Sequence, residues 1–144
     1  MRAPSEEGFD YKYNPGFVFS YDEIGDRQVI DARCKERYLG KAPEPRPTIH
    51  QGHYKGAKCI FFKEVVDTNW CYKSKEEILK VIRDNEIDLE KEVVFYCGSG
   101  VSCCIDILAF ALVGKFDICR LYDGSWAELG NLSDTKNLEA LNYN

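Results

Sequence analysis

The sequence of 144 residues lacks any long run of apolar side chains. No apolar segment is long enough to cross a bilayer, and Met1–Glu7 lacks the apolar stretch of a signal peptide. These absences argue against a membrane partner and against secretion. We therefore expect an intracellular protein, cytoplasmic or mitochondrial, and a cleaved organelle-targeting segment stays open as an alternative.

The sequence also has few histidines, no paired cysteine spacing and no excess of positive charge. Its formal net charge of −5 argues against a nucleic-acid partner. Its two histidines, His50 and His53, leave a metal site without a third ligand of this type. Its seven cysteines are scattered, which predicts neither a disulfide framework nor a zinc site. We predict no metal, no cofactor and a reducing compartment.

Short apolar runs alternate with segments of helical periodicity along the chain. Strands are predicted at 28–33, 57–62, 93–96 and 118–122. Helices are predicted to begin at the Ser-x-x-Glu capping boxes of Ser20, Ser74 and Ser125, and helical segments are also predicted at 35–39 and 105–113. This alternation predicts an α/β fold with a mostly parallel central sheet flanked by helices on both faces.

The polar and proline-rich segments divide the chain. Residues 1–16 are predicted to be an arm, because glycine and proline interrupt any periodicity there. Residues 17–134 form the predicted folded domain, and residues 135–144 form a tail, with fraying expected beyond Leu132. Pro43, Pro45 and Pro47 predict a long extended loop.

The segment CGSGVS at 97–102 carries the strongest chemical signal. Cys97 follows the apolar run VVFY and so lies at the carboxyl end of a predicted buried strand, where sites gather in parallel sheets. Gly98 and Gly100 allow backbone N–H groups to turn toward one point, and a helix begins just beyond them. Both features lower a thiol pKa, so we predict a nucleophilic thiolate at Cys97. The alternative is a buried structural cysteine.

Four ordered motifs resemble those of the rhodanese-like sulfurtransferases. They are VIDAR at 29–33, GHYKGA at 52–57, CGSGV at 97–101 and YDGSW at 122–126. The loop CGSGV resembles most closely the C-terminal catalytic domain of the 3-mercaptopyruvate sulfurtransferases, because thiosulfate sulfurtransferases place basic residues after the cysteine. Residues 13–17, leading into 21–24, are similar to the linker that enters the second domain of two-domain members.

The resemblance implies a function and a set of site residues. Cys97 would take sulfur from 3-mercaptopyruvate as a persulfide, release pyruvate and pass the sulfur to a thiol acceptor such as thioredoxin. Ser99 would assist proton handling or donor orientation, or would only satisfy loop backbone groups. Arg37 and Arg46 would hold the carboxylate and carbonyl of the donor, because arginine offers paired donors. The donor site would be completed by loop residues Gly98, Gly100, Val101 and Ser102.

Several other polar residues are expected to be structural. Asp31 and Arg33 are predicted to pair near the sheet edge, and His53 to hold a turn. Asp123 and Trp126 are predicted to be turn and packing residues beside the pocket. Cys104 matches a cysteine of the mercaptopyruvate group. In contrast, Cys103 replaces a usual alanine, so it is either an inert packing thiol or one that regulates Cys97 through a disulfide.

Three other functions compete with this interpretation. A thiosulfate sulfurtransferase and a persulfide relay or docking module remain alternatives. A dual-specificity phosphatase is rejected, because its longer loop closes on an arginine, where this chain has Ser102 and Cys103. The chain has no second copy of the domain, so we expect it to need a second rhodanese-like domain for full turnover.

Overall fold

The computed structural model describes residues 12–46 and 50–142. Its central sheet has the strand order β1-β6-β5-β2-β4, and every neighbouring pair is parallel. The strands are β1 (Val18–Phe19), β2 (Gln28–Asp31), β4 (Lys58–Cys59), β5 (Val93–Tyr96) and β6 (Cys119–Tyr122). The predicted strands are therefore present, although β4 is shorter than predicted and β1 had no sequence signal.

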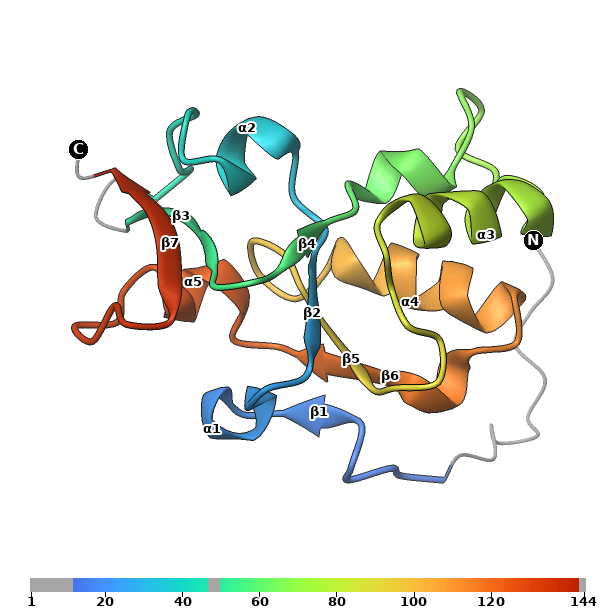
Figure 1. Cartoon of the computed structure of the whole chain (residues 1–144), viewed down its shortest axis with the longest axis horizontal. Coiled ribbons are helices and arrows are strands. Elements are labelled where there is room, and N and C mark those ends of the chain that lie inside the picture. Colours follow the sequence, from blue (N-terminus) through green and yellow to red (C-terminus); the bar gives the residue numbers. More distant parts are fainter. Residues whose placement is uncertain (1–11, 47–49, 143–144) are drawn as a thin grey trace, which may run out of the picture.

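Helices cover both faces of this sheet, as predicted (Figure 1). One face packs against α3 (Lys75–Asp84), α4 (Cys103–Leu112) and the 3-10 helix η1 (Phe62–Val65) through a core that includes Ile30 and Phe95. The other face packs against α1 (Tyr21–Ile24) and α5 (Ser125–Leu129). Alternate residues of the fully buried strand β5 point into the two cores, which explains its unbroken apolar sequence.

Two of the three predicted capping boxes are formed. The backbone N–H of Ser20 donates to Glu23 at 2.7 Å, and that of Ser74 donates to Glu77 at 3.0 Å. The third prediction is wrong. Gly124 is the N-cap of α5, Ser125 has a φ of 51° inside the helix, and Glu128 accepts a hydrogen bond from the Tyr122 hydroxyl. The motif failed there because the Ser125 hydroxyl instead accepts from the Cys97 N–H after β5 and donates to the Tyr122 carbonyl of β6.

The predicted fraying beyond Leu132 is also wrong. Residues Leu138–Asn142 form β7, which pairs antiparallel with β3 (Gln51–Tyr54) after the proline loop. The β3 sequence lacks a β-branched run, and its partner is far away along the chain, so neither strand had a local signal. The proposed domain limits at 16 and 134 stay predictions. Residues 1–11 of the arm and Pro47 lie outside the described residues.

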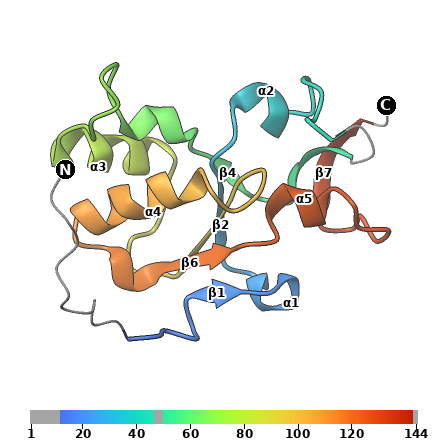
Figure 2. The same ribbon diagram turned by 180° about the vertical axis from the view of Figure 1, so that it is seen from behind.

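The carboxyl ends of the parallel strands meet at one edge of the sheet. Asp31 ends β2, Cys97 follows β5, and Asp123 follows β6. The short helix α2 (Lys35–Tyr38) lies above the loop between β5 and α4 in the view of Figure 2. Among residues 12–46 and 50–142, no helix is long and apolar enough to cross a membrane.

Candidate active site

The loop after β5 is fixed by backbone contacts with the start of α5. The Cys97 N–H donates to the Ser125 hydroxyl at 3.1 Å, and the Cys97 carbonyl accepts from the Trp126 N–H at 2.9 Å. The Gly98 carbonyl accepts from the Ala127 N–H at 3.0 Å. The backbone on both sides of the Cys97 side chain is thus held before any donor binds.

Hydrogen bonds to its sulfur hold Cys97 as a thiolate. The Cys103 thiol contributes most, and burial opposes it; the Ser102 hydroxyl and the backbone N–H groups of Ser99 and Cys103 add to the effect. Together they lower the pKa of Cys97 to about 4. The sequence predicted the backbone donors but not the two side-chain donors. At neutral pH the sulfur is therefore ionised although Cys97 is only 1% exposed.

The two loop glycines have different roles. Gly100 has a φ of 80°, and a Cβ there would lie 2.9 Å from the Asp123 carbonyl oxygen. Gly98 has no positive φ, contrary to the expected backbone role; instead, a Cβ there would lie 3.3 Å from an Arg37 nitrogen. Gly100 therefore shapes the loop, and Gly98 leaves room for the guanidinium.

A pocket of about 440 Å³ opens over the loop. Six of the eight predicted site residues line it: Arg37, Arg46, Gly98, Ser99, Val101 and Ser102. Glu44 and Pro45 complete the lining. Cys97 and Gly100 do not line it, because Cys97 is buried beneath the loop and Gly100 packs against Asp123. The structure thus brings the arginines of α2 and the proline loop to the cysteine loop.

No prediction was made for Glu44 from the sequence. This residue lines the pocket and is hydrogen-bonded to the buried Arg33. Its carboxylate accepts from Arg37 at 2.5 Å and from Arg33 at 2.8 Å, and its side chain is completely buried. The position of this acidic residue between prolines of the same loop as Arg46 was the only signal available. The ion pair holds the Arg37 guanidinium against Gly98.

Arg33 is the centre of this buried network. It donates to Asp31 at 2.6 Å, as predicted, and to the Gly52 carbonyl of β3 at 2.6 Å. Although burial opposes it, the Asp31 carboxylate raises the pKa of Arg33, so its charge is permanent. The guanidinium also lies 4.3 Å above the Trp126 ring. One cation therefore connects β2, β3, the proline loop and α5.

The remaining predicted residues have structural contacts. The His53 ring lies 2.7 Å from the Tyr38 carbonyl oxygen and 3.3 Å from Glu139. The buried Trp126 donates its indole N–H to the His50 carbonyl at 2.8 Å. Within the described part of the chain, no group of three or more His, Cys, Asp and Glu could hold a metal ion.

Asp106 is a buried acid behind the loop. It lies on α4, and neither carboxyl oxygen has a hydrogen-bond partner among the described residues. Burial raises its pKa well above the ordinary value, and the charges of Glu64 and Cys97 act in the same direction. Asp106 is therefore held in its neutral form in the folded protein.

The raised pKa of Asp106 leads to a prediction about how the stability of the fold depends on pH. The folded state keeps a proton on Asp106 that the unfolded state loses above about pH 3.8, so Asp106 lowers stability increasingly as the pH rises toward its folded pKa. We expect Asp106→Asn to unfold with a higher free energy than the parent at pH 8, by about 1–3 kcal/mol, and with a smaller gain at pH 5. Urea unfolding at both pH values measures this; an equal gain at both would contradict it.

Comparisons with known proteins agree with this geometry. The family model described as the rhodanese-like domain matches residues 20–131. The chain is 38% identical over 134 residues to the 3-mercaptopyruvate sulfurtransferase of Rattus norvegicus, covering 88% of this chain and 45% of that protein. It is 37% identical to the mitochondrial thiosulfate/3-mercaptopyruvate sulfurtransferase 1 of Arabidopsis thaliana, covering 88% of this chain and 35% of that protein.

A solved structure shows the same fold. The sulfur transferase subunit of yeast mitochondrial complex I superposes with a TM-score of 0.77 and 36% identity, over 88% of this chain and 47% of that one. The chain thus spans about half or less of the length of these relatives. The matched motifs, the parallel sheet and the placement of the cysteine loop lead to one conclusion: this chain belongs to the rhodanese-like domain family.

Proposed function

We propose that this chain is a sulfurtransferase domain that carries a sulfur atom as a persulfide on Cys97. The observation that supports this most strongly is the position of Cys97 at the start of the glycine loop, where hydrogen bonding by Cys103, Ser102 and the Ser99 backbone lowers its pKa to about 4. A thiolate is the reactive form for attack on sulfur, and the same donors suit a persulfide anion. The named activities of the relatives agree with this chemistry.

The proposed first half-reaction uses 3-mercaptopyruvate as donor. The Cys97 thiolate attacks the donor sulfur and forms a sulfur–sulfur bond, while the carbon–sulfur bond breaks and leaves its electrons on carbon. The resulting enolate takes a proton and departs as pyruvate. In the second half-reaction, a thiol acceptor such as thioredoxin removes the outer sulfur.

The pocket favours a carboxylate donor. Arg37 and Arg46 line it together with Ser99, and paired guanidinium donors suit a carboxylate beside a carbonyl. The residues directly after Cys97 carry no charge. Thiosulfate, the donor in the alternative function, has two anionic ends and would gain from basic residues there. We therefore propose 3-mercaptopyruvate as the preferred donor.

Intact-mass analysis after exposure to each donor tests this proposal. We expect one added sulfur atom on Cys97 with 3-mercaptopyruvate and little or none with thiosulfate. An equal adduct with both donors would favour the thiosulfate alternative. An adduct only after mixing with another persulfidated protein would favour the relay module.

The arginines give a prediction about donor binding. Arg46 is exposed, while Arg37 is tied to Glu44, so Arg46→Ala removes a donor contact without disturbing the buried network. We expect its KM for 3-mercaptopyruvate to rise about tenfold, the equivalent of one charged hydrogen bond, with unchanged fold. Steady-state pyruvate release measures this. Arg83→Ala, at an exposed position on α3, is the matched control; a similar KM in both variants would reject Arg46 as a donor ligand.

We also propose the partners and the compartment. Because the chain spans about half or less of its relatives, a second rhodanese-like domain is the proposed partner for full turnover. None of the seven cysteines, all of them described, forms a disulfide. We propose a reducing compartment, cytoplasmic or mitochondrial, in which thiol acceptors are available.

A further inference from the structure

The loop between η1 and α3 carries an exposed tryptophan on a strained backbone. We call residues 66–73 the Trp70 loop. Trp70 has a φ of 62°, a value that bulky side chains rarely adopt, and it is 64% exposed. The ring therefore adds little to either core, while the backbone strain destabilises the fold. Packing within this chain does not explain why a large aromatic side chain is held there.

Hydrogen bonds hold the Trp70 loop in one conformation. The Asp67 N–H donates to the Cys71 carbonyl at 2.8 Å, and the Trp70 N–H donates to the Asp67 carbonyl at 3.1 Å. One oxygen of the Asp67 carboxylate accepts from the N–H groups of Asn69 and Cys71 at 2.8 and 2.9 Å. The ring is thus presented to solvent by an ordered loop, which lowers the entropy lost when a partner binds.

Two lysines border the tryptophan at a cavity of about 560 Å³. The residues that line it are Lys63, Val66, Asp67, Thr68, Trp70 and Lys73. The Lys63 ammonium lies 5.2 Å from the centre of the Trp70 ring. Within residues 12–46 and 50–142, neither Lys63 nor Lys73 has an ion-pair partner. On a chain whose formal net charge is −5, this cavity combines two free cations with an aromatic face.

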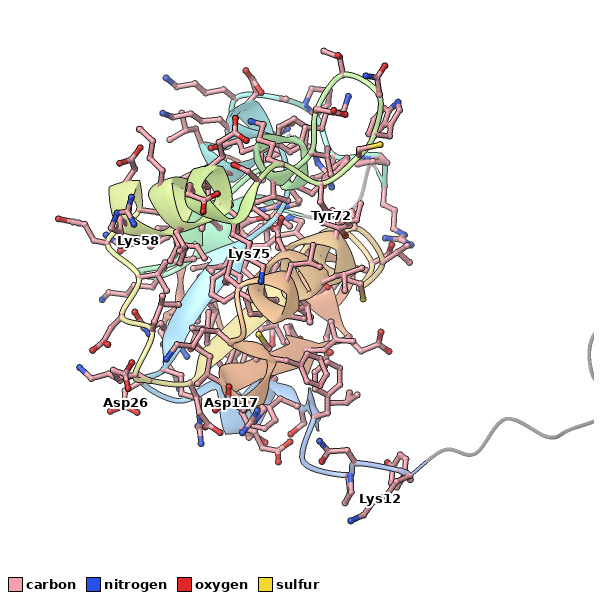
Figure 3. All side chains as sticks on the ribbon, turned by 90° about the vertical axis from the view of Figure 1, so that its right-hand side faces the viewer. Lys12, Asp26, Lys58, Tyr72, Lys75 and Asp117 are labelled. Carbon is pink, nitrogen blue, oxygen red and sulfur yellow. The ribbon has the colours of Figure 1, made fainter. Side chains whose placement is uncertain are left out.

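The Trp70 loop is attached to the helix that follows the cysteine loop. The Tyr72 hydroxyl donates to the Ile105 carbonyl of α4 at 3.1 Å, and Figure 3 shows Tyr72 beside this helix. Ile105 is three residues, or about 4.5 Å of helix, beyond Ser102, which lines the proposed donor pocket. In Figures 1 and 2 the Trp70 loop and α2, which carries Arg37, extend from the same side of the molecule. A protein that covers the pocket would bury about 800 Å² of this chain and so meet the loop.

We propose that the Trp70 loop is a docking surface for the protein that accepts the sulfur, and that this acceptor offers acidic side chains around an apolar patch beside its thiol. The inference rests on the proposed function. The acceptor thiolate bonds to the outer sulfur, the bond between that sulfur and Cys97 breaks, and Cys97 leaves as a thiolate. An acceptor protein must therefore lie over the donor pocket, where its carboxylates pair with Lys63 and Lys73 and its apolar patch covers the Trp70 ring.

A comparison of two acceptors separates docking from chemistry. Pyruvate release at saturating 3-mercaptopyruvate is measured with reduced thioredoxin as the protein acceptor, and with dithiothreitol as a small thiol that reaches Cys97 without touching the loop. We expect Trp70→Ala to raise the KM for thioredoxin about tenfold, as for the loss of a central aromatic contact, and to leave the KM for dithiothreitol unchanged. Phe116→Ala is the matched control, because Phe116 is 51% exposed but lies beyond the far end of α4.

The lysines are tested by charge reversal. Lys63→Glu should lower kcat/KM for thioredoxin about tenfold at low salt, and the loss should shrink at high salt. Lys91→Glu makes the same change of net charge at an exposed position before β5, at the amino ends of the strands. It should leave kcat/KM nearly unchanged. Equal losses in the two variants would show that only net charge matters and would overturn the docking surface.

The strain at Trp70 supplies an independent test. Trp70→Gly removes the ring and also relieves the positive φ, whereas Trp70→Ala removes only the ring. Trp70→Gly should therefore unfold at a higher urea concentration than Trp70→Ala, while both show the same rise in KM for thioredoxin. A rise in Trp70→Ala alone would trace the effect to loop damage and would overturn the docking role.

The outcomes separate this inference from the function beneath it. An unchanged KM for thioredoxin in Trp70→Ala, an equal loss with both acceptors, or a parent chain that uses thioredoxin no better than dithiothreitol would each overturn the docking surface and leave the persulfide chemistry intact. Weaker self-association, or weaker binding of a second rhodanese-like domain, with an unchanged KM for thioredoxin would assign the loop to that partner instead. A parent chain that takes up no sulfur from either donor, or from a persulfidated protein, would overturn the proposed function itself.

Discussion

Cys97→Ser is expected to abolish sulfur transfer, with a loss of at least about 10³-fold in pyruvate release from 3-mercaptopyruvate. The reason is specific to the sulfur. At the pKa of about 4 that the loop imposes, Cys97 is a thiolate throughout the neutral range, whereas a serine hydroxyl stays protonated there. Serine also cannot form a persulfide, so neither half-reaction has an intermediate.

The control for this variant is another cysteine of the same chain. Cys71 is exposed and lies outside the pocket, so Cys71→Ser should keep the parent's activity and lose one alkylation site. Pyruvate release and intact mass are measured for both variants. A Cys97→Ser chain that still took up one sulfur atom would show that another thiol is the carrier.

The largest effect on stability is expected for Arg33→Met. Methionine is similar in length and apolar, so the substitution preserves volume but removes the cation between Asp31 and Glu44. Both carboxylates have side-chain exposures of 0% and would remain buried with less compensation. Breaking a buried ion pair in this way costs about 3–5 kcal/mol. We expect the free energy of unfolding in urea to fall by this amount.

An exposed arginine supplies the comparison. Arg27 pairs with Glu92 at 2.7 Å, and the two side chains are 37% and 36% exposed. Arg27→Met should therefore lower the free energy of unfolding by only about 0–1 kcal/mol. Adding Asp31→Asn to Arg33→Met should recover part of the loss, because among the described residues Asp31 forms an ion pair only with Arg33, whereas Glu44 keeps its ion pair with Arg37. Equal losses for Arg33→Met and Arg27→Met would show that the network carries no special stability.

The local sequence was a good guide where local forces dominate. The apolar run 93–96 predicted a buried strand, and β5 occupies Val93–Tyr96. Ser74 with Glu77 predicted the start of α3, since both partners of that capping box lie within one turn. At Ser125 the same pattern failed, because its hydroxyl accepts a hydrogen bond from the Cys97 N–H in the loop after β5. A short motif cannot show which distant group competes for its side chain.

The strands β3 and β7 show the same limit at longer range. Their pairing joins Tyr54 to Leu138, and Leu138 packs in the core beside Trp126. The tail has too little local periodicity to predict a strand, because its stability comes from a distant partner. The expected frayed tail was therefore wrong, although the α/β fold was right.

The sequence by itself determined the chemistry that this chain offers: a cysteine in a glycine loop after a buried strand, and arginines in two earlier segments of the chain. Only the tertiary structure decided how those groups act. It placed Cys103 and Ser102 on the Cys97 sulfur, and it held Arg37 in the pocket through Glu44. The physical reason is that residue types fix which charges and bonds are available, whereas a pKa depends on burial and contacts that arise only when separate segments pack together.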